Sequence, residues 1–241
     1  MMMNEDFTLY AVPENDAGVI AVSADLNTDM LRNAYRNGFF PWPCEEENVL
    51  WSFPDPRGIL PVADLHIPHG VKRELKTFRR TFELRIDTAF DDVIRACAAA
   101  ERPGQDGTWI TRKLVAAYGQ FHREGFAHSF EAWQEGRLCG GLYGVSLGRI
   151  FCGESMFFHV SGASKFAFLG MMDVLQRCGV ELIDTQMVTP MTESFGAVEV
   201  PAEDYLERLA ALRGEPLTTE ALRNAQAAGP FAVPPDTEPS R

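Results

Sequence analysis

Arg149-Ile-Phe-Cys-Gly-Glu-Ser-Met-Phe157 and, after the next predicted helix, Leu182-Ile-Asp-Thr-Gln-Met187 are two apolar segments that carry two acids and an amide. Side chains alternate between the two faces of an extended strand, so Asp184 and Gln186 share one face of the second strand. Burying a carboxylate costs free energy unless it is paired, so each acid needs a reason to be there. If Glu154 were the one isolated acid, an internal salt bridge would explain it. Two such strands joined by one helix favour a functional site.

The composition predicts a folded protein with a sizeable core and an acidic surface. The 241 residues are 46% hydrophobic, which is enough for one large domain or for a large and a small one. The formal net charge is −12, so any affinity for nucleic acid must come from a local basic patch. Charges interrupt the longest apolar runs well before the roughly 20 residues that a membrane helix needs, so we expect no membrane association.

The cysteines and the start of the sequence bear on the cellular setting. The five cysteines are odd in number, scattered and never in a Cys-x-x-Cys pair, so we expect neither a disulfide framework nor a metal site. The first residues lack the basic and apolar parts of a signal peptide, so we expect a cytoplasmic protein. No heptad pattern or long apolar edge stands out, so we expect a monomer.

Residues 1–62 are rich in proline, glycine and aromatic residues, and they predict a small N-terminal α/β domain. A short helix is expected after an N-cap at Asn27 or Thr28. Two stiff loops follow, Phe39-Phe-Pro-Trp-Pro43 and Trp51-Ser-Phe-Pro-Asp-Pro-Arg57. Rings held in place by prolines serve either as a stacking platform for bases or as a plug between two subdomains.

Residues 63–228 predict a second, larger domain. It begins with a basic helix from about His69 to Leu75, a strand over 81–86, and two helices, one capped by Thr88 and one starting at Thr111. Strands at about 126–134, 137–147 and 149–157 then form an antiparallel meander. A long helix capped by Ser161 crosses to a parallel strand over 180–187, a last helix spans 202–212, and residues 229–241 form a flexible Pro-rich tail.

This order of elements predicts an α+β fold with a mostly antiparallel sheet, and it resembles the acyl-CoA N-acyltransferase (GNAT-like) fold. A CoA-dependent N-acetyltransferase is therefore one hypothesis. Such enzymes hold the CoA pyrophosphate with an Arg/Gln-x-x-Gly-x-Gly/Ala loop. The nearest segment, Arg137-Leu-Cys-Gly-Gly-Leu142, fails at its last position and lies inside the meander, which counts against that hypothesis.

Five unusual motifs lie in order between about Gly18 and Leu209. They are Asn37-Gly-Phe-Phe-Pro-Trp42, Trp51-Ser-Phe-Pro-Asp-Pro-Arg57, Gly107-Thr-Trp-Ile-Thr111, Phe151-Cys-Gly-Glu-Ser-Met-Phe157 and Ile183-Asp-Thr-Gln186. Together they resemble the leucyl/phenylalanyl-tRNA–protein transferases. The resemblance implies an enzyme without a cofactor that moves Leu or Phe, and less well Met, from aminoacyl-tRNA to the N-terminus of proteins that begin with Arg or Lys, which marks them for degradation.

The resemblance also implies roles for the polar residues of the two strands. Asp184 would orient Gln186, and the amide oxygen of Gln186 would hold the attacking amine. A carboxamide is too weak a base to take the proton of that amine, so Asp184 or the departing ribose oxygen is expected to receive it. Glu154 is suited to the cationic side chain, or to the ammonium group, of an acceptor that starts with Arg or Lys.

The donor side chain needs an apolar pocket, and the tRNA end needs a stacking surface. Flexible methionines would let one pocket accept Leu, Phe and Met, although a plain core explains the same residues nearly as well. Met191 departs from the His that the family has there, which bears on donor choice. The corresponding pocket positions are Leu142, Met156, Met171, Leu175 and Ile183, and the aromatics expected to stack on the terminal adenosine are Trp42 and Trp109.

A basic cluster early in the second domain is the candidate for phosphate contact. It comprises Lys72, Arg73, Lys76, Arg79 and Arg80, and its alternative reading is a solvated surface. By the resemblance it would meet the acceptor stem of the tRNA through phosphates, not through sequence. A non-catalytic tRNA-binding module is a third hypothesis, against which the presence of Asp184 and Gln186 argues.

Overall fold

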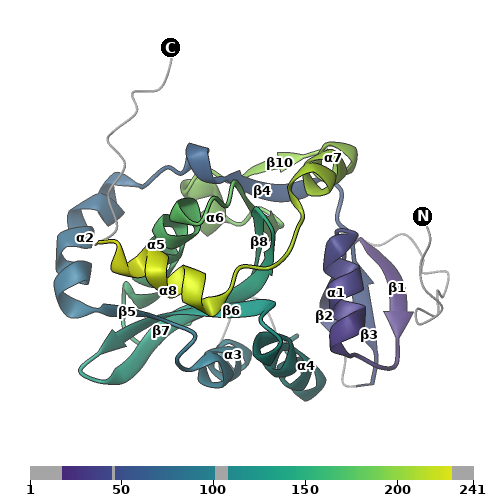
Figure 1. Cartoon of the computed structure of the whole chain (residues 1–241), viewed down its shortest axis with the longest axis horizontal. Coiled ribbons are helices and arrows are strands. Elements are labelled where there is room, and N and C mark those ends of the chain that lie inside the picture. The colour runs from purple at the N-terminus through teal and green to yellow at the C-terminus, as the bar shows by residue number, and fades with distance from the viewer. Residues whose placement is uncertain (1–17, 45–46, 101–107, 230–241) are drawn as a thin grey trace, which may run out of the picture.

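The computed structural model describes residues 18–44, 47–100 and 108–229, in which the chain forms two β-sheets flanked by helices. The smaller sheet is antiparallel in the order β1-β3-β2 and, with helix α1, forms an N-terminal unit at one side of the molecule (Figure 1). Its elements are β1 (Val19–Ser23), α1 (Thr28–Arg36), β2 (Phe40–Cys44) and β3 (Val49–Ser52). The side chain of Asn27 accepts a hydrogen bond from the Met30 N–H, which confirms one of the two expected caps of this helix.

The larger sheet has seven strands in the order β10-β4-β9-β8-β7-β6-β5. Only the β8–β9 pair is parallel, so the expected α+β fold with a mostly antiparallel sheet and a parallel crossover is confirmed. The strands are β4 (Arg57–Pro61), β5 (Glu83–Ile86), β6 (Ala127–Gln134), β7 (Arg137–Leu147), β8 (Ile150–Phe158), β9 (Leu182–Gln186) and β10 (Val198–Val200). Because β4 pairs with β9, the chain passes from one sheet to the other between Ser52 and Arg57. We propose that the two domains divide there, a few residues before the boundary expected after residue 62.

Helices cover both faces of the larger sheet. The crossover helix α5 (Ala163–Arg177) packs on strands β5 to β8 and is flanked by α2 (His69–Thr81) and α8 (Thr219–Ala227). Helices α3 (Phe90–Ala99) and α4 (Arg112–Arg123) contact strands of the same sheet below it in the view of Figure 1. The remaining elements are a 3₁₀ turn (Val62–Asp64), α6 (Pro190–Ser194) and α7 (Ala202–Leu212).

No helix in the part of the chain that the structure describes has both the length and the apolar character needed to cross a membrane.

One apolar core joins the N-terminal unit to the larger domain. It contains Leu31 of α1 and Trp51 of β3 together with Leu114 and Phe121 of α4, all fully buried. Burying side chains of this size typically contributes about 1.5–3 kcal/mol each. The N-terminal unit is therefore held firmly against α4, and it can contribute side chains to a site in the larger domain.

Several expected helix boundaries are wrong. Helix α2 continues to Thr81 instead of ending near residue 75, because Val71, Leu75 and Phe78 keep a buried stripe at helical spacing. Helix α5 begins at Ala163 after Gly162, which takes a left-handed conformation that ends the preceding turn, so Ser161 is not its cap. Helix α8 and strand β4 were not expected. The Pro-rich tail beyond Gly229 lies outside the described residues.

The expected cap of α3 is also wrong. Thr88 does not cap the helix with its own side chain. The buried carboxylate of Glu131, on β6, instead accepts hydrogen bonds from the N–H groups of Thr88 and Ala89, at 2.9 and 2.8 Å. This acid comes from more than 40 residues away along the chain, so local sequence could not reveal it.

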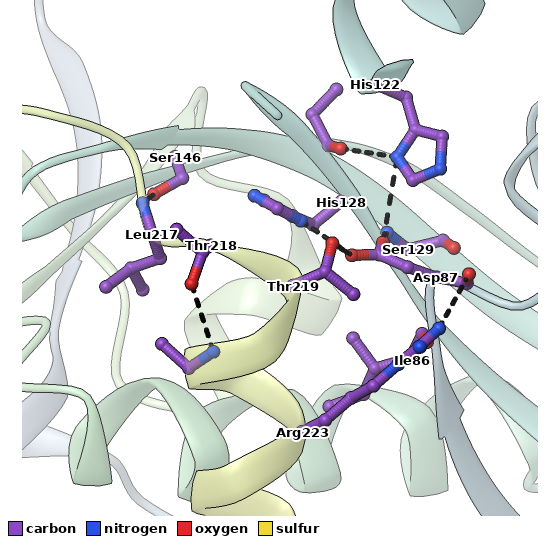
Figure 2. A network of polar contacts seen from close by, with 12 residues as sticks. Ile86, Asp87, His122, His128, Ser129, Ser146, Leu217, Thr218, Thr219 and Arg223 are labelled. Carbon is purple, nitrogen blue, oxygen red and sulfur yellow. Dashed lines mark hydrogen bonds and ion pairs between the residues drawn. The ribbon is translucent and has the colours of Figure 1, made fainter. Parts of the chain in front are cut away.

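The C-terminal helix α8 is attached to the larger sheet through a polar network around Asp87, which follows β5 (Figure 2). The Asp87 carboxylate accepts hydrogen bonds from Nδ1 of His128 (2.8 Å), from the hydroxyl of Thr219 (2.6 Å) and from the N–H of Ser129 (2.8 Å). The guanidinium of Arg223 donates to the carbonyl oxygens of Ile86 and Asp87. The Asp87 carboxylate therefore connects both β6 and α8 to the end of β5.

Replacing Asp87 by Asn should lower the free energy of unfolding by about 3 kcal/mol, because a buried acceptor of several hydrogen bonds loses its charge and part of its acceptor capacity. Burial alone would raise the pKa of Asp87, but the hydrogen bonds from His128, Thr219 and Ser129 outweigh it and hold that pKa below its usual value. The stabilisation is therefore present above the unfolded pKa of about 3.9 and disappears as the pH falls below it.

Urea denaturation at a series of pH values checks this prediction. The difference between wild type and Asp87→Asn should be largest near neutrality and should narrow as the pH approaches 3. The exposed Glu181, which pairs with Arg149, offers a control, since Glu181→Gln should change stability by less than about 1 kcal/mol. An equal effect of Asp87→Asn at all pH values would contradict the assignment.

Candidate active site

Strands β8 and β9 separate after a short parallel pairing. They pair only from Ile150 to Cys152 on β8, opposite Leu182 to Asp184 on β9. The next residue, Gly153, has almost nothing beside it, since an added Cβ would meet only the Asp184 carbonyl oxygen at 3.9 Å. A register shift between Tyr143 and Gly144 bends β7 and β8 at the same level. The sheet therefore opens where the acid of β8 and the amide of β9 lie.

Glu154 and Gln186 face each other across this opening. The amide Nε2 of Gln186 donates to Oε1 of Glu154 at 2.9 Å. Gln186 has φ +64°, in the left-handed region that residues other than glycine seldom adopt, and the N–H of Met187 bonds to the carbonyl of Thr185 at 2.7 Å. Strained backbone of this kind clusters at functional sites. Glycine at position 58 on β4 leaves room for the turn at Gln186, because a Cβ there would lie 2.6 Å from the Met187 carbonyl carbon.

Asp184 is fully engaged within the protein. Its Oδ1 accepts from Nε of Arg57 and from the N–H of Gln186, both at 2.9 Å. Its Oδ2 accepts from Nη2 of Arg57 at 2.7 Å and from the hydroxyl of Tyr205 at 2.8 Å. With four donors around a carboxylate that is 1% exposed, no position is left for a substrate group.

Arg57 is the cation that compensates Asp184. Its side chain is 1% exposed, and its guanidinium carbon lies 4.9 Å from the ring centre of Phe40, 5.8 Å from Phe53 and 4.4 Å from Tyr205. Burial alone would lower its pKa, but Asp184 and Tyr205 more than reverse this effect, so that Arg57 keeps its charge. Residues from the N-terminal unit, β4 and α7 thus hold Asp184 in one orientation.

Glu154 lies in a different electrostatic setting. Its Oε2 accepts a hydrogen bond from the hydroxyl of Tyr118 at 3.2 Å. Burial raises the pKa of Glu154 to about 7, although the hydroxyls of Tyr35 and Tyr118 and the charge of Arg57 favour its ionised form. A carboxyl group with this pKa exchanges its proton near neutral pH.

A cavity of about 360 Å³ continues from this opening toward α5. Four of the five residues expected to form the donor pocket line it, namely Leu142, Met156, Met171 and Ile183. Leu175, one turn beyond Met171, is instead buried in the core beneath α5 and does not line the cavity. Other residues line the cavity that the sequence did not suggest for the pocket, among them Phe168, Thr185, Met187 and Thr189. Met191, the position expected to bear on donor choice, lines the cavity as well.

The two expected stacking residues occupy different places. Trp109 lines the same cavity as Glu154. Trp42, on β2, is half-buried against the core that joins the N-terminal unit to the larger domain, and it does not line the cavity. Only Trp109 is thus placed beside the polar pair.

The expected phosphate contacts lie on one face of α2. Helix α2 packs on α5 with its apolar stripe, and the five basic side chains lie on the remaining surface. Arg73, Lys76, Arg79 and Arg80 are exposed, and Lys72 is partly buried. No cluster of three or more His, Cys, Asp or Glu side chains with the arrangement of a metal site occurs among the described residues.

Comparison with known proteins gives a consistent result. The model of the leucyl/phenylalanyl-tRNA protein transferase family matches residues 59–210, and the model of the N-terminal domain of that family matches residues 24–55. The chain is 48% identical over 220 residues to the leucyl/phenylalanyl-tRNA–protein transferase of Anaeromyxobacter dehalogenans, a match that covers 91% of this chain and 93% of that protein. It is 43% identical to the protein of the same name from Nitratidesulfovibrio vulgaris, over 92% of this chain and 90% of that one.

Proposed function

The chain belongs to the leucyl/phenylalanyl-tRNA–protein transferases and moves an aminoacyl group from tRNA to protein N-termini, and we propose that it does so where the Glu154–Gln186 pair meets the cavity between β8 and β9. The observation that carries this proposal is the polar pair itself, held where β8 and β9 separate beside a lined cavity. Family membership decides for aminoacyl transfer over CoA-dependent acetylation and over a non-catalytic module.

The cavity receives the side chain of the donor amino acid. Its walls near α5 are apolar, with Met156, Met171 and Ile183 on three different elements. Leucyl and phenylalanyl groups gain free energy by leaving water for such a surface. Methionines adapt their shape to either group, which supports a preference for Leu and Phe with weaker use of Met.

The polar pair aligns the acceptor amine with the ester carbonyl of the donor. Gln186 uses its amide N–H to bind Glu154, so its amide oxygen is the atom that accepts an N–H of the amine. Asp184 holds the backbone N–H of Gln186 and so fixes the strained turn. An aminoacyl ester is already activated, and correct alignment can remove several kcal/mol of the barrier without a covalent nucleophile.

The acceptor protein and the tRNA approach this opening from outside. Glu154 supplies the negative charge for an acceptor that begins with Arg or Lys, and Trp109 supplies a ring on which the terminal adenosine stacks. Trp42 would assist only indirectly, through the packing of the N-terminal unit. A GNAT-like arrangement of the larger sheet, a monomeric state and a cytoplasmic location are further parts of this proposal.

A transfer assay tests the function. The purified protein is incubated with labelled Leu-tRNA or Phe-tRNA and with matched peptides that begin with Arg, Lys, Asp or Ala. Label on the Arg and Lys peptides alone is the expected result. Label on the Asp peptide would remove the role given to Glu154 in acceptor choice, and no label on any peptide would overturn the proposed function.

The exposed basic face of α2 is proposed to bind phosphates of the tRNA acceptor stem. Replacing Arg73 and Lys76 by Ala together should weaken tRNA binding and reduce the slope of log affinity against log salt by about one for each lost contact, because fewer counterions are released. Binding measured between low and moderate salt checks the slope. Arg95→Ala on α3 is the control, since this exposed arginine pairs with Asp92 elsewhere on the surface. An unchanged slope would place the tRNA on another face.

A further inference from the structure

Two buried tyrosines are linked to the carboxylate oxygen of Glu154 that Gln186 does not bind. Tyr118 lies on α4 and is 0% exposed, and Tyr35 lies on α1 of the N-terminal unit and is 3% exposed. Their phenol oxygens are 2.5 Å apart. Tyr118 also contacts Oε2 of Glu154 at 3.2 Å, so that a hydrogen-bonded chain runs from the N-terminal unit to the opening between β8 and β9.

The chemistry of the groups fixes the direction of this chain. An ionised carboxylate only accepts hydrogen bonds, so Tyr118 donates to Glu154 and in turn accepts from Tyr35. A phenol can both donate and accept. If Glu154 gains a proton, both hydroxyls can rotate and the chain can run the other way. The tyrosine pair therefore suits both charge states of Glu154, which a backbone N–H donor would not.

Asp184 has no such freedom. Its four hydrogen bonds come from Arg57, Gln186 and Tyr205, and a proton on either oxygen would displace one of these donors and leave Arg57 buried without its counter-charge. Such a loss is costly in a buried ion pair. Of the two acids at the opening, only Glu154 can change its charge without breaking the structure that holds it.

We propose that Glu154 takes the proton released by the attacking amine, and that Tyr118 and Tyr35 are positioning residues that hold Glu154 ready for it. This inference rests on the proposed function of the site. The amine nitrogen forms a bond to the ester carbonyl carbon, and its proton moves to an oxygen of Glu154. As the bond from that carbon to the ribose oxygen breaks, the ribose oxygen takes the proton and Glu154 returns to the carboxylate.

The surroundings of Glu154 fit a group that accepts and releases a proton near neutral pH. Burial raises its pKa to about 7, against the opposing effect of both tyrosines. The titratable and charged groups that face it come from five elements. They are Tyr35 on α1, Tyr118 on α4, Arg57 on β4, Cys152 on β8 and Asp184 on β9.

The test is the pH profile of kcat/KM for transfer from Phe-tRNA to one peptide that begins with Arg. Tyr118→Phe removes a donor to the carboxylate, so the pKa of Glu154 should rise and the acid limb should move to higher pH by about one unit. Tyr35→Phe should move it in the same direction, because the Tyr35 hydroxyl also favours the ionised form of Glu154. The acceptor amine is the same in every assay, so its own titration cancels in the comparison.

Tyr205→Phe is the matched control, because it also removes one buried hydroxyl but from Asp184, and its acid limb should stay in place. Melting temperatures of the three variants establish that they fold. If the wild type transfers label and the acid limb of Tyr118→Phe lies at the same pH as that of the wild type, the inference is overturned while the proposed function stands. If the wild type transfers no label to any acceptor, the proposed function fails and the inference with it.

Discussion

Replacing Glu154 by Gln should lower kcat/KM for transfer by about 10²- to 10⁴-fold, the usual contribution of a group that accepts a proton in the rate-limiting step. Glutamine has nearly the same shape and can still bond to Tyr118, so the opening between β8 and β9 should keep its form. It cannot take a proton, however, so the acid limb that reflects Glu154 should disappear as well. Single-turnover transfer of labelled Phe to a peptide that begins with Arg measures the effect apart from product release.

Binding measurements separate this loss from weaker donor binding, and the KM for the Arg peptide separates it from weaker acceptor binding, since Glu154 is also proposed to meet the positive charge of the acceptor. Phe-tRNA should bind Glu154→Gln with wild-type affinity, because the tRNA contacts are proposed to lie on α2 and at Trp109. Glu181→Gln, an exposed change near the start of β9, should leave transfer unchanged. A Glu154→Gln enzyme that transfers within threefold of the wild-type rate would show that the proton goes elsewhere, with the ribose oxygen as the remaining acceptor.

Replacing Arg57 by Met should lower the free energy of unfolding by about 3–5 kcal/mol, the cost of leaving a buried charge without its partner. Asp184 would lose two of its four hydrogen bonds and the cation that compensates its charge, while methionine would keep much of the contact with Phe40, Phe53 and Tyr205. The turn at Gln186 depends on Asp184, so transfer should be lost together with stability.

Urea denaturation and transfer assays on the same preparations measure both effects. Arg149→Met is the control, since Arg149 is half-exposed and its pair with Glu181 is worth at most about 1 kcal/mol. The loss of stability in Tyr205→Phe should lie between those of Arg57→Met and Arg149→Met, because the loss of one hydrogen bond costs roughly 1–3 kcal/mol. A stable and fully active Arg57→Met protein would contradict the account of Asp184 as a fixed anchor.

Sequence patterns predicted the parts of the fold that local periodicity controls. The meander of β6, β7 and β8 follows from alternating side chains and tight turns, and the crossover to β9 follows from the length of the helix between them. The prediction failed where a distant residue decides the outcome. Glu131 replaces Thr88 as the group that satisfies the start of α3, and Asp87 attaches α8, a helix that the sequence did not suggest.

The site was predicted in part. Glu154, Asp184 and Gln186 stood out because polar groups in apolar strands need partners, and the structure brings all three together. Arg57 ends one of the family motifs, yet nothing local shows that it pairs with a carboxylate 127 residues away. Tyr35 and Tyr118 are aromatic residues on amphipathic helices, which ordinarily signify core, so their hydroxyl chain appears only once α1 and α4 are packed together.

The donor pocket shows a further limit of sequence reading. Met171 and Leu175 are one helical turn apart on α5, and both are apolar and buried. The cavity lies where β8 separates from β9. Met171 lines this cavity, and Leu175 does not. Residue type therefore identifies a candidate lining, and the packing of strands decides which candidates line a space.

If the aminoacyl group lies in the cavity between β8 and β9, photocrosslinking should find it there. Phenylalanyl-tRNA with an azide on the ring is bound, irradiated and mapped by mass spectrometry, with unmodified Phe-tRNA as competitor. Competed crosslinks to Met156, Met171 or Ile183 are the expected result. A second apolar cavity, of about 510 Å³ and lined by Phe39 and Leu206 among others, provides the contrast. Competed crosslinks there, and none on β8 or α5, would show that the aminoacyl group does not lie between β8 and β9.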